Sequence, residues 1–340
     1  MPMSQFHQPV MLQDVFKYLN IQPDSWYVDC NLGGGGHTRA ILQAGGKVLG
    51  IDLDPDPVQE VAEHYNLPIQ FLNNHNTYVN RHPELVSEPV PNWIRESPQI
   101  PKQVRNDNGS IQVVTERLIL CQSNFNQIQD LVAKYKLTDI KGILFDLGVS
   151  THQLETPERG FSFNMDAPLD MRMGRKQSVT ATDLINGLHE PELVELFEKY
   201  GEERMAKRIA RKIVQARLKK LISTTNQLAQ VIVATRPRGI HDRIHPATRV
   251  FQALRIAVND EINNLKHALP QAFQVLSPSG KLVVISFHSL EDRIVKNYFK
   301  LLETNHQAKI LTPKPITPTE DEIQNNPRSR SGKLRAIEKI

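Results

Sequence analysis

Cysteine is scarce in this sequence, and long apolar runs are missing from it. Cys30 and Cys121 are the only two cysteines among 340 residues, and this number excludes a disulfide framework. Both lie inside apolar, strand-like stretches, so we expect two buried thiols in a reducing compartment. No apolar run approaches the roughly 20 residues that cross a bilayer, and residues 1–20 lack the pattern of a secretory signal. We therefore expect a cytoplasmic protein with no membrane partner.

A large excess of charge and a metal-binding pattern are also missing. The net charge of +4 is modest and does not by itself indicate a polyanionic partner. No group of cysteine and histidine residues has the spacing of a zinc site, so we expect no metal. Hydrophobic residues make up 39% of the chain and charged residues 23%, as in ordinary globular proteins. A chain of this length has room for about two domains.

Strands and helices are predicted to alternate in the first part of the chain. A strand of sequence Trp-Tyr-Val-Asp follows Ser25, and a glycine cluster and a helical segment separate it from a second strand at Lys47 to Asp54. Further strands are predicted at Arg117 to Gln122 and at Gly142 to Leu147, with a helical segment between them. This alternation predicts an α/β fold with a mainly parallel, doubly wound sheet.

Two segments interrupt this pattern. Residues 65–115 lose periodicity and collect proline and asparagine, which predicts an inserted, partly disordered loop. Residues 155–250 hold amphipathic helical stretches and no convincing strand, which predicts an inserted helical domain. One long helix is predicted to carry the apolar residues from Val250 to Leu265. We therefore expect one sheet domain made of residues 1–154 and 251–340, with the helical domain between its two parts.

A turn of four glycines, Gly33 to Gly36, follows the first predicted strand and precedes a helix. Glycine lets backbone amides approach a ligand where a side chain would collide with it. Asp29 ends the first strand and Asp52 ends the second, where a carboxylate can accept hydrogen bonds from both ribose hydroxyls of a nucleoside. NAD and S-adenosylmethionine both fit this pattern. The glycine spacing favours the second, because Thr38 stands where a G-x-G-x-x-G motif needs its last glycine.

Asp146 lies at the end of the predicted strand Gly142 to Leu147. The carboxyl ends of parallel strands form the edge where α/β folds bind ligands, so Asp146 is a candidate site residue. A structural alternative stays open for each of these two features. The glycines could form a tight turn that binds no ligand, and Asp146 could cap the turn that follows its strand.

Several uncommon strings occur in order along the chain. They are His7-Gln-Pro-Val-Met-Leu, Gly35-Gly-His37, Asp146-Leu-Gly-Val-Ser150, Arg159-Gly-Phe-Ser-Phe163, Pro168-Leu-Asp-Met-Arg-Met173, His245-Pro-Ala-Thr-Arg249 and Phe287-His-Ser-Leu-Glu-Asp-Arg293. Together they resemble the RsmH (MraW) family, and the resemblance covers nearly the whole chain outside residues 65–115. It implies a class I (Rossmann-like) S-adenosylmethionine methyltransferase fold. It also implies N4-methylation of one cytosine in 16S, the small-subunit ribosomal RNA.

The resemblance further implies which residues bind the cofactor, S-adenosyl-L-methionine. The family's cofactor contacts fall on Gly35, Gly36, His37, Asp52, Phe125, Asp146 and Gln153. The glycines, Asp52 and Asp146 agree with the independent prediction above, whereas Phe125 and Gln153 follow from the resemblance alone. Their ordinary alternatives are a core phenylalanine and a solvated glutamine.

Cytosine N4 is a poor nucleophile because its lone pair is delocalised into the ring. A hydrogen-bond acceptor is therefore expected to localise that pair and receive the proton. Asp146 is the first candidate, and Asp170 and His288 are further candidates on the substrate side, with a solvated or turn-capping role as their alternative. Methylation at cytosine C5 instead needs a thiolate, and neither cysteine lies on a plausible catalytic loop. Methylation on nitrogen is favoured.

Aromatic and basic residues supply candidate RNA contacts. Phe163 and Arg172 can hold a base outside its stack, with core packing as the alternative for Phe163. Eight basic residues and no acidic one lie between Arg204 and Lys220, and among them we expect Arg208 and Arg211 to contact RNA phosphates. A solvated helix surface is the alternative. The expected partner is small-subunit ribosomal RNA or the small ribosomal subunit.

Two other functions stay open. An NAD-linked oxidoreductase is disfavoured by the glycine spacing, and a binding test with both cofactors would separate it from a methyltransferase. A ribosome-assembly protein that binds RNA without turnover is kept open by two departures from the family pattern. These are Asn31, where a threonine is common, and the insertion at residues 65–115.

Overall fold

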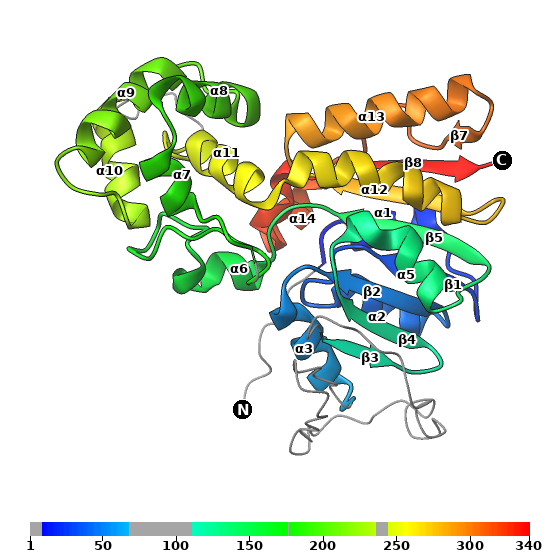
Figure 1. Ribbon diagram of the computed structural model, residues 1–340. Coiled ribbons are helices and arrows are strands. Elements are labelled where there is room, and N and C mark those ends of the chain that lie inside the picture. The colour runs from blue at the N-terminus through cyan, green and yellow to red at the C-terminus, as the bar shows by residue number, and fades with distance from the viewer. Residues whose placement is uncertain (1–8, 68–110, 176, 236–243) are drawn as a thin grey trace. The chain divides into compact units, whose positions relative to one another are not determined.

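A computed structural model describes residues 9–67, 111–175, 177–235 and 244–340 (Figure 1). The chain divides into two compact units. The first, here the sheet unit, contains Met1–Gly148 and Asn264–Ile340, and the second, here the helical unit, contains Val149–Asn263. Each unit is described by itself.

Within the described residues, eight strands form the single sheet of the sheet unit. The strands are β1 (Trp26–Asp29), β2 (Lys47–Asp52), β3 (Gln112–Val114), β4 (Leu118–Gln122), β5 (Ile140–Asp146), β6 (Lys281–Ser286), β7 (Ala308–Ile310) and β8 (Lys333–Lys339). Their order across the sheet is β3-β4-β2-β1-β5-β6-β8-β7. The five central strands, from β4 to β6, are parallel, whereas β3 and β8 run antiparallel to their neighbours.

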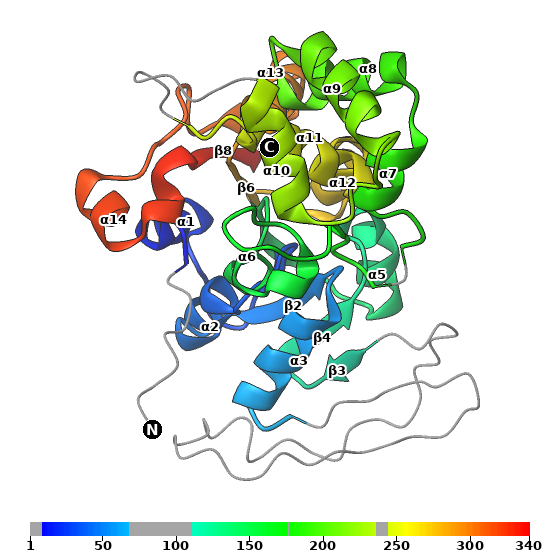
Figure 2. The same ribbon diagram turned by 90° about the vertical axis from the view of Figure 1, so that its left-hand side faces the viewer.

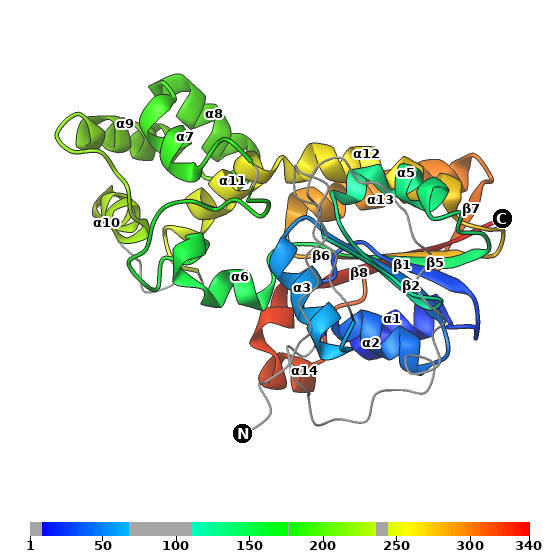
Figure 3. The same cartoon turned by 60° about the horizontal axis from the view of Figure 1, so that its bottom comes forward.

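Helices cover both faces of this sheet (Figure 3). One face packs against α1 (Leu12–Leu19), α2 (Gly36–Gln43) and α3 (Pro55–His64). The other packs against α5 (Ile128–Lys134), α12 (Glu261–Val275) and α13 (Ser289–Thr304). The inner strands are buried on both sides and are therefore apolar almost throughout, as β6 is in Leu-Val-Val-Ile. The predicted class I fold with a mainly parallel, doubly wound sheet is confirmed.

Segments far apart in the sequence meet beside the first helix. The short helices α14 (Glu320–Asn325) and η3 (Pro327–Ser331) lie near α1 (Figure 2). The backbone amide of Met11, which precedes α1, donates a hydrogen bond of 2.5 Å to the carboxylate of Glu322. The C-terminal segment thus contacts the residue before α1 and also supplies β8, which lies between β6 and β7 in the sheet.

The predicted insertion, residues 65–115, includes residues at its C-terminal end that belong to the sheet. Residues 112–114 form β3, which pairs antiparallel with β4, although the sequence prediction gave them no structure. Their side chains include the buried Val113. Most of the predicted insertion, residues 68–110, lies outside the described residues, as does His7 of the first string.

Helices make up the second unit. They are α6 (Thr151–Glu155), the 3-10 turn η2 (Pro157–Arg159), α7 (Ala181–Gly187), α8 (Glu190–Gly201), α9 (Ala206–Arg217), α10 (Thr225–Thr235) and α11 (Thr248–Asn259). Their apolar faces form one core that includes Leu193, Phe197, Ile213 and Leu254. Among the described residues of this unit no strand is present beyond an isolated bridge between Pro168 and Thr224.

The unit boundaries differ from the predicted ones, 154/155 and 250/251. The structure divides the chain after Gly148 and after Asn263. Helix α11 belongs to the helical unit because Val250 and Leu254 are part of its core, and because α8 packs closely against α11 at Gly201. A Cβ atom at Gly201 would lie only 2.6 Å from the carbonyl oxygen of Arg249.

The long helix predicted from Val250 to Leu265 is two helices, and that prediction was wrong. Asp260 separates α11 from α12 with a left-handed backbone, φ 49°, and its amide caps the end of α11. The apolar spacing continues across this break, so periodicity alone did not show it. Aspartate is one of the few residues that adopt this conformation readily. In the part of the chain that the structure describes, no helix is long and apolar enough to cross a membrane.

Candidate active site

Three aspartates end three neighbouring parallel strands. Asp52 ends β2, Asp29 ends β1 and Asp146 ends β5, and the order β2-β1-β5 places these strands side by side. Carboxyl ends of parallel strands meet at one edge of a sheet, which is the usual ligand-binding edge of α/β folds. The structure therefore brings together the three carboxylates that the sequence predicted separately.

The glycine turn follows β1 and leads into α2. Gly33 and Gly35 have left-handed backbones with φ of 47° and 70°, and the amide of Gly35 donates to the carbonyl oxygen of Leu32. A Cβ atom at Gly35 would lie 2.6 Å from Cγ2 of Val61 on α3. Glycine is therefore required at position 35 both for the conformation and for the close approach of α3.

Asp52 closes the turn from the neighbouring strand. Its two carboxylate oxygens accept hydrogen bonds from the amides of Gly33, at 3.0 Å, and Asp54, at 2.9 Å. Burial raises the pKa of Asp52 to about 7, and the nearby carboxylates of Asp54 and Asp29 add to the rise, while the two amides oppose it. Each oxygen keeps a lone pair for a further donor, such as a ribose hydroxyl.

Asp29 joins β1 to α2 beneath the turn. It is fully buried, and its Oδ2 accepts a hydrogen bond of 2.7 Å from the hydroxyl of Thr38. Burial raises the pKa of Asp29 to about 6. Thr38 was noted in the sequence only as the residue that breaks a glycine motif. Its contact was missed, although a threonine in the first turn of a helix that follows a strand-ending aspartate is a usable signal.

His37 lies on the first turn of α2 and faces Asp146. Its Nε2 is 3.4 Å from Oδ2 of Asp146, and the side chains are 5% and 21% exposed. Within the described residues, Nδ1 of His37 has no hydrogen-bond partner and nor has the buried Oδ1 of Asp146, whereas Nε2 pairs with Oδ2 of Asp146. Burial alone would lower the pKa of His37, but Asp146, Asp29 and Glu322 raise it above its usual value. The turn and β5 thus share a buried acid-imidazole pair.

Phe125 and His288 complete the predicted residues of the sheet unit. Phe125 begins the 3-10 turn η1 (Phe125–Gln127) after β4, and its half-buried ring packs edge-on against Phe145 at 5.6 Å. His288 caps the N-terminus of α13: its Nδ1 accepts from the amide of Glu291, whose carboxylate accepts from the amide of His288. In this structure the imidazole of His288 therefore stabilises a helix end.

Gln153 lies in the helical unit, on α6. It is buried and forms a capping box with Ser150, in which the side chain of Gln153 accepts from the amide of Ser150 at 3.1 Å. The solvated glutamine considered from the sequence is therefore not what the structure contains. The capping box fixes the start of α6, seven positions after Asp146 in the sequence.

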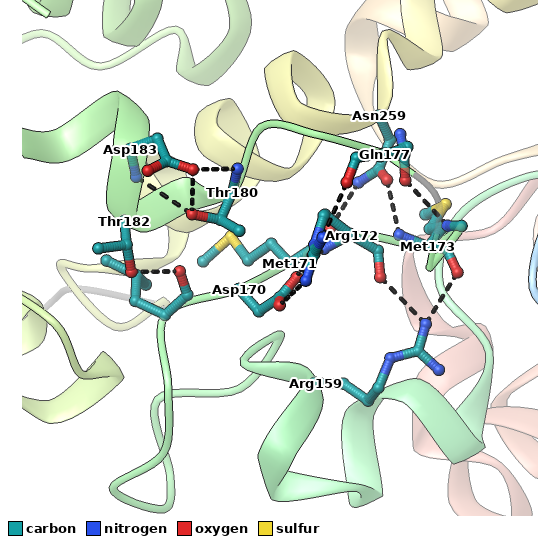
Figure 4. A network of polar contacts seen from close by, with 12 residues as sticks. Arg159, Asp170, Met171, Arg172, Met173, Gln177, Thr180, Thr182, Asp183 and Asn259 are labelled. Atoms are coloured by element: carbon teal, nitrogen blue, oxygen red, sulfur yellow. Dashed lines mark hydrogen bonds and ion pairs between the residues drawn. The ribbon is translucent and has the colours of Figure 1, made fainter. Parts of the chain in front are cut away.

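Asp170 and Arg172 form a bidentate ion pair on the loop between η2 and α7 (Figure 4). Nε and Nη2 of Arg172 donate to the two oxygens of Asp170 at 2.8 and 2.7 Å. Burial opposes ionisation of Asp170, but the hydrogen bonds and charge of Arg172 prevail and lower the pKa of Asp170 below its usual value. Arg172 also donates through Nη1 to the carbonyl oxygen of Gln177.

The same loop is clamped by residues that the sequence did not single out as functional. Arg159 donates to the carbonyl oxygens of Arg172 and Met173 at 3.0 and 2.9 Å. Asn259 donates to the carbonyl oxygen of Met171 and accepts from the amide of Met173, both at 2.8 Å (Figure 4). Asn259 is a polar residue in the apolar pattern of α11, and that departure was the available signal.

Phe163 belongs to an aromatic group of the helical unit. It stacks on the imidazole of His245, with ring centroids 4.5 Å apart, and meets Phe251 edge-on at 5.1 Å. Phe163 is half-buried. One face of the Phe163 ring is therefore covered by His245. From the sequence, His245 was named only as the first residue of one family string.

Helix α9 carries the central part of the basic segment Arg204–Lys220. Its buried face is Ala206, Ile209, Ala210 and Ile213, while Arg208 and Arg211 are exposed. Arg211 has a surface ion pair with Glu190 at 3.5 Å. Arg217 differs, because its guanidinium donates to the carbonyl oxygens of Ile185 and Leu188 at the end of α7. The basic segment therefore combines an exposed charged face with one arginine that stabilises the fold.

Comparisons with known proteins place these features in a family. The model of the MraW methylase family matches residues 4–88 and 101–340. A protein from Dehalococcoides mccartyi named "Ribosomal RNA small subunit methyltransferase H" is 40% identical over 352 residues, which cover 98% of this chain and 86% of that protein. Proteins of the same name from Carboxydothermus hydrogenoformans and Geobacter sulfurreducens are 39% and 40% identical, and each comparison covers 98% of this chain. The alignments cover 98% and 99% of those two relatives.

Proposed function

The chain belongs to the MraW methylase family, and from this premise we propose that it methylates the exocyclic N4 of a cytosine in 16S, the small-subunit ribosomal RNA. The cofactor is S-adenosyl-L-methionine, which supplies a methyl group already activated on a sulfonium. Relatives that match nearly the whole chain are named as small-subunit ribosomal RNA methyltransferases. We further propose that it acts in the cytoplasm on the small ribosomal subunit or its RNA.

The observation that carries this proposal is the row of three aspartates beside the glycine turn. The amides of Gly36 and His37 stand at the N-terminus of α2, where backbone donors approach a ligand without side chains between, and Gly35, whose own amide donates to Leu32, shapes the turn before them. Asp52 retains acceptor capacity for ribose hydroxyls. The buried, unpartnered Oδ1 of Asp146 also fits a ligand donor, since within the described residues no protein group satisfies it.

We propose Phe125 and Gln153 as further cofactor contacts, in accordance with the family resemblance. Phe125 is half-buried near the ends of β4 and β2 and offers an apolar surface to a nucleoside base. Gln153 is held by the capping box at the start of α6. Its backbone and side chain are therefore fixed before a ligand arrives, which lowers the entropic cost of binding.

We propose Asp146 as the group that accepts the proton from N4. An acceptor on the N4–H bond localises the nitrogen lone pair during methyl transfer. Both oxygens of Asp170 are engaged by Arg172, and the low pKa of Asp170 makes it a weak base. The Nδ1 of His288 accepts a helix amide. Asp170 and His288 are therefore less suited to the task, and we assign Asp170 to holding Arg172 in place for the substrate.

Cytosine C5 methylation is a poor fit to this chain. That reaction needs a thiolate nucleophile, and the chain has two cysteines. Cys30 and Cys121 are both buried, and burial raises the pKa of each thiol above its usual value. An inert, protonated thiol inside the sheet cannot add to a pyrimidine ring.

The helical unit offers the RNA-binding surface in this proposal. The exposed Arg208 and Arg211 of α9 would neutralise phosphates. Phe163 and Arg172 would contact the target base or its neighbours, through an aromatic face and a guanidinium plane. The clamped loop supports Arg172 because Arg159 and Asn259 fix its backbone.

The proposal is tested by methyl incorporation from labelled S-adenosylmethionine into unmodified small and large ribosomal subunits. We expect label in small-subunit RNA only, and we expect Asp146→Asn to slow incorporation by about 100-fold or more. The exposed Asp130→Asn on α5 is the matched control and should retain activity. Cofactor binding without incorporation on any subunit would instead support the RNA-binding assembly protein, and binding of NAD in place of S-adenosylmethionine would support an oxidoreductase.

A further inference from the structure

His37 is a buried histidine whose Nδ1 has no hydrogen-bond partner among the described residues, while its Nε2 faces the carboxylate of Asp146 at 3.4 Å. Its side chain is 5% exposed, so water has little access to the unpaired Nδ1. A buried polar group that is left unpaired costs free energy, and histidines with a purely structural role are normally bonded. The proposed cofactor contact of His37 uses its backbone amide at the start of α2. Its side chain therefore calls for a separate explanation.

Carboxylates face the imidazole from three elements. Asp146 on β5 is 3.4 Å from Nε2, Asp29 ends β1, and Glu322 lies on α14. Burial alone would lower the pKa of His37, but these three carboxylates together raise it above its usual value. Asp52 on β2 adds negative charge next to Asp29. The imidazole thus occupies a place where the surrounding charges stabilise a proton.

We propose that His37 is a positioning residue for methyl transfer, which receives the substrate proton from Asp146 and so restores the Asp146 carboxylate. This inference rests on the proposed function, in which Asp146 is the first acceptor. The imidazole of His37 would thus act in proton transfer, in addition to the proposed cofactor contact of its backbone amide.

The step balances without any further reactant. Methyl transfer forms a C–N bond at N4 and breaks the C–S bond, which leaves N4 with a positive charge and one proton too many. That proton moves to Oδ1 of Asp146, and the electron pair of the N–H bond stays on nitrogen. The carboxyl group turns about its Cβ–Cγ bond and passes the proton to Nε2 of neutral His37. The charges of Asp146 and Asp29 then stabilise the imidazolium, and the exposed 5% of the His37 side chain is the route by which the proton leaves to solvent.

The protonation state of His37 before the reaction should control the rate. An imidazolium at His37 forms an ion pair with Oδ2 of Asp146, so the carboxylate becomes a weaker hydrogen-bond acceptor for N4–H. Neutral His37 leaves that charge available and can receive the proton. The single-turnover rate should therefore rise with pH through the raised pKa of His37.

The test compares single-turnover methyl transfer at saturating S-adenosylmethionine, from pH 5.5 to 9, in the wild-type protein and three variants. His37→Gln keeps a polar side chain but cannot titrate, so we expect the rising limb that belongs to His37 to disappear and the plateau rate to fall about tenfold. Asp29→Asn should move the limb to lower pH, because one carboxylate that stabilises the imidazolium is lost. Asp130→Asn, exposed on α5, should leave the limb unchanged.

A purely structural role for His37 predicts a different result, in which His37→Gln lowers the rate by the same factor at every pH. An unchanged limb in His37→Gln would overturn the proposal. If that variant fails to bind cofactor, NMR titration of the His37 imidazole in the wild-type protein decides. The proposal requires a pKa above the usual value that falls in Asp29→Asn, and a pKa at or below the usual value contradicts it.

Failure of this inference can be separated from failure of the proposed function. If the wild-type protein methylates small-subunit RNA but His37→Gln keeps the pH profile, only the role of His37 is wrong. If the wild-type protein binds S-adenosylmethionine but transfers no methyl group, the proposed function itself fails, and the NMR titration still reports whether the imidazole holds a proton.

Discussion

At the scale of single residues, Asp52 is a proposed cofactor contact whose protonation should affect cofactor binding. Its carboxylate accepts two backbone amides, and burial raises its pKa to about 7. A protonated carboxyl group has one oxygen less to offer as an acceptor, so ribose hydroxyls should bind best to the ionised form. The negative charge of Asp52, which we propose the cofactor needs, is therefore present above pH 7 and is lost as the pH falls through the pKa.

We predict that the affinity for S-adenosylmethionine falls below pH 7, by up to about tenfold per pH unit. Asp52→Asn should bind weakly and lose this dependence on pH. Isothermal titration calorimetry from pH 5.5 to 8.5 measures both, with Asp130→Asn as the control that keeps the wild-type profile. An Asp52→Asn profile that parallels the wild type would show that another group titrates.

At the scale of elements, the turn between β1 and α2 depends on its glycines. Gly35 combines φ of 70° with a contact to Val61 that leaves no room for Cβ. We predict that Gly35→Ala lowers the free energy of unfolding by about 1–3 kcal/mol and weakens cofactor binding. Gly187→Ala on α7 is the matched control, because nothing lies within 4 Å of its Cβ position and its φ is not positive. Equal thermal stability of the two variants would contradict this account.

A second element, α9, separates arginines that stabilise the fold from arginines proposed to bind RNA. Arg217 satisfies carbonyl groups at the end of α7, so Arg217→Met should cost about 1–3 kcal/mol of unfolding free energy. Arg208→Gln and Arg211→Gln are exposed changes that should leave the melting temperature nearly unchanged.

RNA binding, unlike stability, should depend on Arg208 and Arg211. Each substitution should reduce the slope of log affinity against log salt concentration by about one for a phosphate contact. Filter binding to small-subunit RNA at several salt concentrations measures these slopes. Unchanged slopes in both variants would remove α9 from the proposed RNA surface. The ion pair of Arg211 with Glu190 is exposed and contributes little to stability.

Elements were predictable from sequence where the pattern is local. The strands that end in Asp29, Asp52 and Asp146 follow from short apolar runs bounded by turns. The break at Asp260 was not predictable, because the apolar spacing of α11 continues into α12 and only a backbone angle separates them. Strand β3 was missed because it follows a segment without periodicity and is defined by its pairing with β4. Pairing between strands is a tertiary property that no local pattern contains.

At the scale of the whole molecule, the sheet unit is assembled from two separate parts of the chain, Met1–Gly148 and Asn264–Ile340. The sequence predicted this interruption from the change of periodicity, but not its limits, since those depend on which core Val250 and Leu254 join. The same holds for the site. Strand-ending aspartates were visible in the sequence, whereas the pairing of His37 with Asp146 required the β1-β5 neighbourhood in space.

The most direct test of the central claim identifies the methylated nucleoside. Unmodified small subunits are incubated with the protein and S-adenosylmethionine that carries a deuterated methyl group, and the digested RNA is analysed by mass spectrometry. We predict labelled N4-methylcytidine, at one position. Labelled 5-methylcytidine, or the absence of any labelled nucleoside while cofactor binding is intact, would contradict the claim that this chain is a cytosine-N4 methyltransferase.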